Sequence, residues 1–364
     1  MSIMKKFAGA AVTLGMVLGA TVGVSSVAYA DHTITLRIGS GHPSAPVAYV
    51  DSMENFFVPE VTKRVAARTD HKIRFIEAYA GTVAKVAETL EAVEKGLLDI
   101  GGWCQCFEPT KALGMNITYF LPFTTPDAVE QVKVFRKLIT EFPELYEDYS
   151  GKYNQTLLAI SGFDNYGLGT TFAWEKTEEL KGRKILGAGP NLPWISMSGA
   201  LPVTTTLPTA YNQLETGVGE GLLMFPSSYN GFKFHEPAPY FKITNFGAMA
   251  QISLTMNNDT RKKLPPEVVA IIDEVAKEYE IVSTQNSADR EKSGLENMRK
   301  EGAIITEMTR SAQTAWAQLL IDWPAERAQA ISDQEGIDGK KIMRRYIELL
   351  AERGHDFPVD YPIN

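Results

Sequence analysis

The chain has 364 residues, of which 44% are hydrophobic and 22% charged, so it is large and apolar enough for two folded lobes. Its formal net charge of −8 disfavours DNA, RNA and anionic lipid as partners. The five histidines are scattered without the spacing of a zinc site, and we expect no bound metal.

The first thirty residues have the pattern of an export signal. Lys5 and Lys6 precede an apolar stretch at 7–24, and Ala28-Tyr29-Ala30 is the small-x-small pattern that a signal peptidase cuts. We expect cleavage after Ala30 and a periplasmic mature protein. No later stretch approaches the ~20 apolar residues of a membrane span, so we do not expect the mature protein to be membrane-inserted.

The next part of the chain alternates strand and helix patterns. Strand patterns lie at 33–38, 72–76 and 97–101, and helical spacing of apolar residues lies at 47–67, 83–95 and 126–142. Such an order predicts a parallel or mixed sheet with helices on its faces.

A strand pattern at 155–161 starts a second α/β unit. Its further elements are short strands at 184–186, 201–204 and 218–223, and helices at 193–197 and 209–217. A strand at 248–256 could run back to the first unit. We predict a first lobe at 31–160 and 247–285, and a second at 161–246 and 286–364.

The clearest element begins at Leu264-Pro265-Pro266-Glu267, because proline and an acidic residue favour a helix start. An apolar stripe continues the helical pattern to about Lys300. At 1.5 Å per residue this helix is ~50 Å long and would span both lobes. Two helices, near 312–323 and 339–353, close the chain. We therefore predict an α/β protein of two lobes, with a ligand crevice at the carboxyl ends of the strands.

Cys104 and Cys106 are separated by one residue. In a strand their side chains would point to opposite faces, and a bridge between such positions is geometrically poor. We expect two half-buried thiols.

Several segments resemble the DctP-like substrate-binding subunits of tripartite ATP-independent periplasmic (TRAP) transporters. They are 93–100 (VEKGLLDI) with 121–123 (LPF), 179–185 (ELKGRKI) with 199–203 (GALPV), 211–221 (YNQLETGVGEG), and the Leu264-Pro265 helix start. The resemblance implies a two-lobed periplasmic binding protein with a long helix across both lobes. It also implies a small-molecule ligand, two membrane permease subunits as partners, and uptake driven by an ion gradient.

The departures from that family concern ligand charge. Members carry an arginine where this chain has Leu186, and a further basic residue where 161–169 has none. Polar residues usually stand where this chain has 222–225 (LLMF). A buried carboxylate without a partner is costly, so dicarboxylates are disfavoured.

Two kinds of ligand remain open. We expect an amine or zwitterion, such as an ethanolamine- or choline-like compound, held by aromatic faces and the Asp164 carboxylate. The alternatives are an apolar or aromatic monocarboxylate bound by the same fold, or a sensory protein that feeds a membrane receptor.

Candidate ligand contacts follow the predicted strands. They are His42, Trp103, Gln105, Phe163, Asp164, Asn165, Tyr166, Leu186, Asn191, Trp194, Phe225, Ser228 and Tyr229. Trp103, Trp194 and Phe225 could instead belong to a lobe core, and Asp164 and His42 could be turn residues. The sequence has no nucleophile elbow and no dinucleotide fingerprint, so we expect neither catalysis nor a cofactor.

Overall fold

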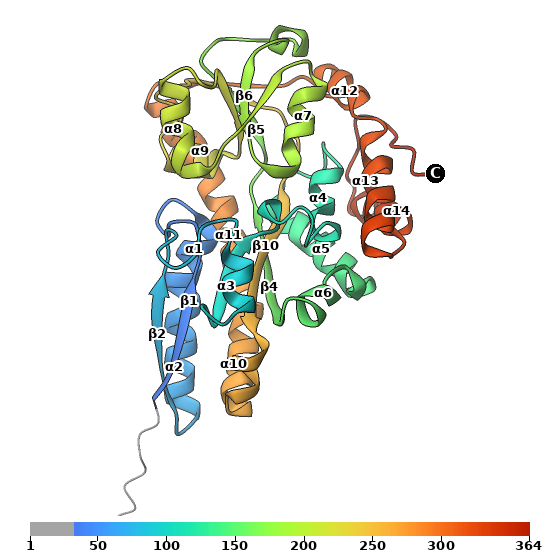
Figure 1. The fold of residues 1–364 in the computed structure, drawn as a ribbon. Helices are drawn as coiled ribbons and strands as arrows, with labels where there is room; N and C mark the ends of the chain where they lie inside the picture. Colours follow the sequence, from blue (N-terminus) through green and yellow to red (C-terminus); the bar gives the residue numbers. More distant parts are fainter. Residues whose placement is uncertain (1–32) are drawn as a thin grey trace, which may run out of the picture. The chain divides into compact units, whose positions relative to one another are not determined.

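The computed structural model describes residues 33–364, which form one compact unit (Figure 1). The predicted signal peptide and the Ala30 cleavage site lie outside the described residues. Two β-sheets, joined by crossing segments and one long helix, organise this unit as two lobes.

The first lobe is built on a mixed five-stranded sheet. Its strands, in spatial order, are β2 (Lys72–Ala78), β1 (Thr33–Gly39), β3 (Ile100–Cys104), β10 (Met249–Asn257) and β4 (Gln155–Phe163). Strand β1 is parallel to β2 and β3, whereas β10 is antiparallel to β3 and β4. The predicted return of the chain through 248–256 to the first unit is therefore confirmed.

The second lobe is built on a six-stranded sheet of short strands. They lie in the order β11 (Ile304–Glu307), β9 (Tyr240–Ile243), β5 (Gly167–Thr170), β8 (Gly221–Met224), β6 (Lys184–Gly187) and β7 (Leu201–Thr204). The sequence predicted β6, β7 and β8 but not β5, β9 and β11, which are four residues each and carry no clear alternation.

The helices cover both sheets. In the first lobe they are α1 (Ala48–Ser52), a π-helical turn (Met53–Phe57), α2 (Val58–Arg68), α3 (Thr89–Glu94), α4 (Ile117–Phe120), α5 (Ala128–Glu141) and α6 (Glu147–Gly151). Helix α5 begins where predicted, because the Asp127 carboxylate accepts from the N–H groups of Val129 and Glu130.

Later in the chain are α7 (Leu192–Met197), α8 (Leu207–Glu215), α9 (Pro226–Gly231), α10 (Asn258–Lys263), α11 (Pro266–Lys300), α12 (Arg310–Leu319), α13 (Trp323–Glu335) and α14 (Gly339–Glu352). Helix α14 packs on α5, where the Tyr346 hydroxyl bonds the Gln131 amide. The sequence predicted helices near 312–323 and 339–353 but not α13, and it assigned 286–364 to the second lobe, whereas α13 contacts α4 and α14 contacts α5 of the first lobe.

The structure corrects the bounds of three predicted elements, of which one is β8, predicted at 218–223 and found at Gly221–Met224. Helix α3 covers only 89–94 of the predicted 83–95, since the chain before it forms turns. Strand β3 starts at Ile100 rather than 97, because Gly96 has a φ of +68° and Leu97 is half exposed.

Helix α11 has the 35 residues that its sequence predicts, and it contacts elements of both lobes. The Tyr279 hydroxyl donates to the carbonyl of Tyr49 in α1 (2.9 Å), and Ser283 Oγ lies 2.8 Å from Ser161 Oγ in β4. Gly294 lies against α9, where a Cβ atom would come within 3.1 Å of the Pro226 carbonyl oxygen.

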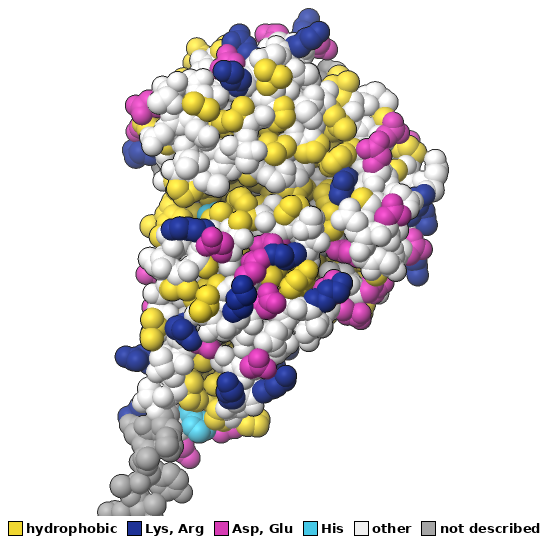
Figure 2. Space-filling view, viewed as in Figure 1, with side chains coloured by type: hydrophobic (Ala, Val, Ile, Leu, Met, Phe, Trp, Pro, Cys, Tyr) yellow, Lys and Arg dark blue, Asp and Glu magenta, His cyan; other side chains and the backbone are white. Residues whose placement is uncertain are grey.

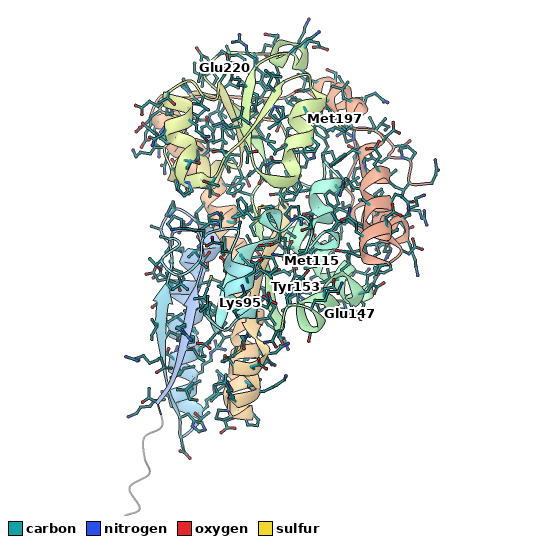
Figure 3. All side chains as sticks on the ribbon, in the orientation of Figure 1. Lys95, Met115, Glu147, Tyr153, Met197 and Glu220 are labelled. Atoms are coloured by element: carbon teal, nitrogen blue, oxygen red, sulfur yellow. A yellow bond between two sulfur atoms is a disulfide. The ribbon has the colours of Figure 1, made fainter. Side chains whose placement is uncertain are left out.

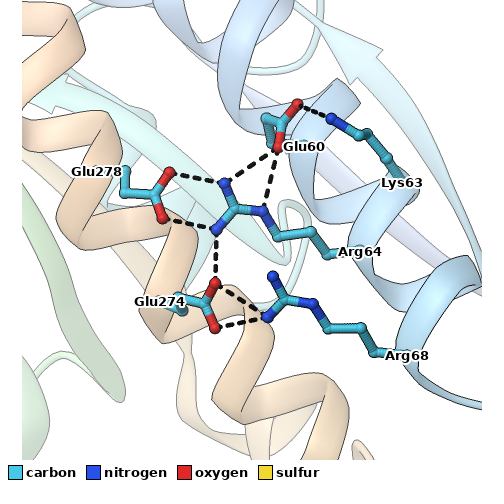
Figure 4. Close-up of polar contacts among 6 residues, drawn as sticks. All are labelled: Glu60, Lys63, Arg64, Arg68, Glu274 and Glu278. Atoms are coloured by element: carbon cyan, nitrogen blue, oxygen red, sulfur yellow. Dashed lines mark hydrogen bonds and ion pairs between the residues drawn. The ribbon is translucent and has the colours of Figure 1, made fainter.

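An ion-pair network ties α2 to α11 (Figure 4). The Arg64 guanidinium donates to both carboxylate oxygens of Glu278 (2.6 and 2.7 Å), to Glu274 (2.6 Å) and to Glu60 (3.1 Å). Arg68 donates to Glu274 from the next turn. The Arg64 side chain is only 14% exposed, so its bidentate pair is better shielded than an ordinary surface pair.

We predict that Arg64→Ala lowers the midpoint of thermal unfolding by roughly 2–4 °C, because three carboxylates lose their shared cation. Lys63→Ala is the matched control: its side chain is 73% exposed and pairs with Glu60 alone. Calorimetry of both variants checks this, and equal midpoints would show that the network does not stabilise the fold.

Candidate ligand-binding site

A cavity lies where the carboxyl ends of strands from both lobes meet. The empty space at this site is about 420 Å³ when the adjoining open solvent is included. Its lining residues are His42, Cys104, Cys106, Phe107, Tyr119, Phe163, Tyr166, Ala188, Asn191, Thr205, Thr206, Leu207, Met224, Phe225 and Gln251. On the face shown in Figure 2, hydrophobic side chains gather in a band across the middle of the described unit.

Aromatic rings from the two lobes meet in this cavity. Phe163 ends β4 of the first lobe and stacks on Phe225, which follows β8 of the second, at a centroid distance of 4.2 Å. Tyr119 and Tyr166 join through their hydroxyl groups (2.9 Å). Burial raises the pKa of Tyr166 to about 12, so both hydroxyls remain neutral hydrogen-bonding groups at physiological pH.

Cys104 and Cys106 form a disulfide on the cavity wall, and the expectation of two half-buried thiols was wrong. Both residues are buried, and β3 ends at Cys104. The chain then enters a 3-10 turn, which brings the two Cα atoms to 5.2 Å, within the range of ordinary disulfides. The strand geometry assumed from the sequence therefore does not apply at Cys106.

The disulfide turn meets a glycine of the second lobe. Gly189 has a φ of +55°, and a Cβ atom there would lie 2.3 Å from the carbonyl oxygen of Cys106. A larger residue at 189 would push this loop away from the turn. The loop also carries Asn191, whose Oδ1 accepts from the Ala188 N–H (3.0 Å) and is thereby fixed at the cavity wall.

His42 is held in the cavity wall by a fixed set of hydrogen bonds. Its Nδ1 lies 3.0 Å from the Tyr49 hydroxyl, and its backbone N–H donates to Ser40 Oγ (3.2 Å). Its Nε2 is buried and has no partner within residues 33–364. Burial lowers the pKa of His42 to about 4, so the ring is neutral at physiological pH.

Gln251 is a second polar group in the cavity wall, and the sequence analysis missed it. It sits at a bulge in the pairing of β10 with β4, between Ala250 and Ile252, and bulges re-aim side chains. It is fully buried and lies beside the Tyr119 and Tyr166 hydroxyls, but neither atom of its amide makes a hydrogen bond of ordinary geometry among the described residues. The glutamine within the apolar stretch 248–256 could have indicated the site, because a buried side-chain amide normally has a hydrogen-bond partner.

The lining carries no formal charge. Among residues 33–364, the side chains that line the cavity include no Asp, Glu, Lys or Arg. Its hydrogen-bonding groups are neutral hydroxyls, amides and the His42 ring. Such a site can hold a mostly apolar molecule through a few oriented polar contacts.

Five of the thirteen predicted contacts line the cavity: His42, Phe163, Tyr166, Asn191 and Phe225. The other eight do not. Five of these eight side chains form hydrogen bonds with other residues of the protein instead. They are Trp103 (with Thr255), Gln105 (with Ser253), Asn165 (with Asn245 and Gly247), Trp194 (with Tyr119) and Tyr229 (with Ala238).

Leu186 and Ser228 are buried away from the cavity. Leu186 packs so closely against Gly219 that a Cβ atom there would come within 2.4 Å of it. Glu220, labelled in Figure 3, precedes β8 at the end of the sheet opposite the cavity and pairs with Arg183. The family-like segment around Glu220 therefore stabilises the second lobe rather than contacting a ligand.

Asp164, the expected counter-charge for an amine, is bound within the protein. Its carboxylate accepts from the Ser227 N–H (2.9 Å), from Ser227 Oγ (2.5 Å) and from Ser287 Oγ in α11 (3.2 Å). It thus fixes the start of α9 against the long helix. Burial raises the pKa of Asp164 to about 6, and burial together with the Asp164 charge raises that of Glu291 to about 8.

Residues 33–364 offer neither a metal site nor a membrane-spanning helix. No group of three or more His, Cys, Asp or Glu side chains is placed to hold a metal ion. No helix there is both long and apolar enough to cross a membrane.

Comparison with known proteins identifies both the family and the fold. The model of bacterial extracellular solute-binding protein family 7 (DctP) matches residues 51–326. A TRAP solute-binding protein from Rhodoferax ferrireducens, solved with co-purified benzoate, superposes with a TM-score of 0.75 at 17% identity, covering 88% of this chain and 98% of that one.

Two further solved structures share the fold. One is a marine metagenome TRAP solute-binding protein specific for aromatic acids, solved with 3-hydroxybenzoate (TM-score 0.77, 16% identity, 88% and 98% coverage). The other is a Bordetella pertussis extracytoplasmic solute receptor that binds pyroglutamic acid (TM-score 0.71, 18% identity, 86% and 99% coverage). The predicted two-lobed α/β fold is confirmed.

We predict that the pair Asp164 and Glu291 makes stability fall as pH rises from about 5 to 8. Both carboxyl groups hold protons more tightly in the folded chain than in the unfolded one, so the folded state loses its advantage as they ionise. The Glu291→Gln variant removes the carboxyl group that has the higher pKa of the two. Relative to wild type, its unfolding midpoint should therefore rise with pH.

The matched control is Glu296→Gln, on an exposed position of the same helix. Thermal unfolding at pH 5, 6, 7 and 8 gives the comparison. A difference between Glu291→Gln and wild type that is constant with pH would contradict the assignment.

Proposed function

Because the chain belongs to bacterial extracellular solute-binding protein family 7, we propose that it is a periplasmic receptor for an apolar or aromatic monocarboxylate. It would deliver this solute to the two membrane subunits of a TRAP-type transporter. The observation that carries the proposal is the cavity between the lobes, whose walls are aromatic and apolar and whose polar groups are all neutral.

The free-energy cost of burying a charge limits how many charges the ligand can carry. A carboxylate moved out of water needs donors or a counter-charge, and each unpaired anion costs several kcal/mol or more. The lining offers two polar groups that can donate and that make no hydrogen bond of ordinary geometry among residues 33–364, His42 Nε2 and the Gln251 amide, the latter beside the Tyr119 and Tyr166 hydroxyls. These suit one carboxylate, whereas a dicarboxylate would bury a second anion against apolar walls.

An amine is less well supported than an acid. The Asp164 carboxylate is already hydrogen-bonded to Ser227 and Ser287, and it does not line the cavity. A cation could also bind over aromatic faces, but Phe163 and Phe225 cover one another by stacking. The cavity therefore offers an ammonium group no counter-charge.

Two of the structural relatives support the same ligand class. The Rhodoferax ferrireducens protein was solved with benzoate and the marine metagenome protein with 3-hydroxybenzoate. At 17% and 16% identity they establish only the fold, so the chemistry of this chain's own cavity carries the proposal. Sugar acids need many hydrogen-bonding groups, and this lining is mostly apolar.

We predict that benzoate and related monocarboxylates stabilise the exported protein against heat. Choline, ethanolamine and dicarboxylates should not. A ligand at 100 times its Kd adds about 2.7 kcal/mol to the unfolding free energy, which a thermal-shift assay resolves easily. Stabilisation by amines alone would overturn the proposed ligand class.

The Gln251→Leu variant should weaken benzoate binding roughly three- to tenfold, because one neutral hydrogen bond is lost. Ser228→Ala is the matched control, since Ser228 Oγ is also buried and unpartnered but does not line the cavity. Isothermal titration calorimetry measures both variants. Equal affinities would remove Gln251 from the site.

A further inference from the structure

We propose that the His42 ring gains a second proton when a ligand enters the cavity, so that the receptor binds a carboxylate together with one proton taken from solvent. The inference rests on the proposed function and deepens it, because it assigns the group that neutralises the ligand. It depends on the position and hydrogen bonding of a single buried ring.

The His42 ring is oriented before any ligand arrives. The Tyr49 hydroxyl contacts Nδ1 at 3.0 Å and also lies 2.8 Å from Ser40 Oγ. The Tyr49 and Phe107 rings meet the imidazole edge-on, with centroids at 5.9 and 5.8 Å. With Nδ1 occupied, Nε2 is the nitrogen left for a molecule in the cavity, and it is buried without a partner among the described residues.

The Tyr49 hydroxyl can form a hydrogen bond with His42 Nδ1 whether the ring is neutral or protonated. In the neutral ring, the Tyr49 hydroxyl donates to Nδ1 and the single ring proton is on Nε2. In the protonated ring, Nδ1–H donates to the Tyr49 oxygen, and the hydroxyl turns to donate to Ser40 Oγ. Tyr49 and Ser40 therefore form a short relay that accommodates a second ring proton without moving heavy atoms.

The surroundings keep the ring neutral until an anion arrives. Among residues 33–364, the titratable side chain in contact with His42 is Tyr49, and those elsewhere in the lining are Tyr119 and Tyr166. None of them is charged at neutral pH, and burial alone lowers the pKa of His42 to about 4. A carboxylate next to Nε2 would supply the opposite charge that favours the protonated ring.

Proton balance then gives the pH dependence. Above pH 6 both the free carboxylate and the free His42 ring lack the proton that the complex holds. Each complex formed takes up one proton, and the Kd rises about tenfold per pH unit until the complex itself deprotonates. A ligand without charge, such as benzamide, would bind with no proton uptake.

Calorimetric titration of the full exported protein with benzoate at pH 7, in buffers of differing ionisation enthalpy, counts the protons exchanged. We expect an uptake near one for wild type and for His71→Gln, whose histidine lies outside the cavity. His42→Gln keeps a donor but cannot be protonated, so its uptake should fall to near zero. Uptake that persists in His42→Gln would place the proton on the ligand and overturn the proposal.

If His42→Gln binds no benzoate, its proton uptake cannot be measured. Nitrogen-15 NMR of histidine-labelled wild-type protein then reports the protonation state of the ring directly. Saturation with benzoate at pH 7 should convert one buried histidine from the neutral to the doubly protonated spectrum. A ring that stays neutral in the complex overturns the proposal, while the monocarboxylate function stands. If no monocarboxylate binds, both the His42 proposal and the monocarboxylate function are overturned. Both are also overturned if the protein binds benzamide but not benzoate, because the ligand would then be neutral.

Discussion

Helix α11 contacts both lobes through small and hydroxyl-bearing side chains, and this close packing sets how the walls of the cavity meet. Ser283 lies against β4, Ser287 bonds Asp164 where the chain leaves β4, and Gly294 lies against α9. Large side chains at these positions would hold the helix further from the crossing segments. The Phe163–Phe225 stack therefore depends on residues of a helix that does not line the cavity itself.

The cost of burying charge shapes the site. The acids Asp164 and Glu291 lie among hydrogen-bond donors at the crossing of the chain, outside the cavity lining. The groups that line the cavity are neutral, and we propose that the His42 ring gains a charge only when an anion binds beside it, because burial lowers its pKa to about 4. Under the proposed function, such a receptor would discriminate by ligand charge, because it would accept one anion with one proton and disfavour a second anion.

Much of the fold follows from the sequence. Helix α11 was predicted over its whole length, and β7 and α5 closely, because proline starts, capping groups and apolar stripes are local signals. Strands β5, β9 and β11 were missed because their sequences carry no clear alternation, whereas β6, β7 and β8, which are equally short, were predicted. The packing of α14 on α5 rests on contacts between residues more than 200 positions apart, which no local pattern records.

The candidate site was only partly predictable. Residues that follow strands, such as His42 and Phe225, could be placed at the crevice by topology alone. Gln251 could not, because a bulge inside β10 aims it, and the disulfide depends on a 3-10 turn that ends β3. Asp164 follows its strand as predicted, yet Ser227 and Ser287 bind its carboxylate within the protein.

The central claim, that the cavity takes a monocarboxylate of mostly apolar character, is tested most directly by native mass spectrometry. For this experiment the full-length chain is expressed and the protein is purified without added ligand. The bound small molecule is then released and identified. The account predicts an aromatic or aliphatic acid with one carboxyl group. Recovery of a quaternary amine, a dicarboxylate or a sugar acid would contradict it.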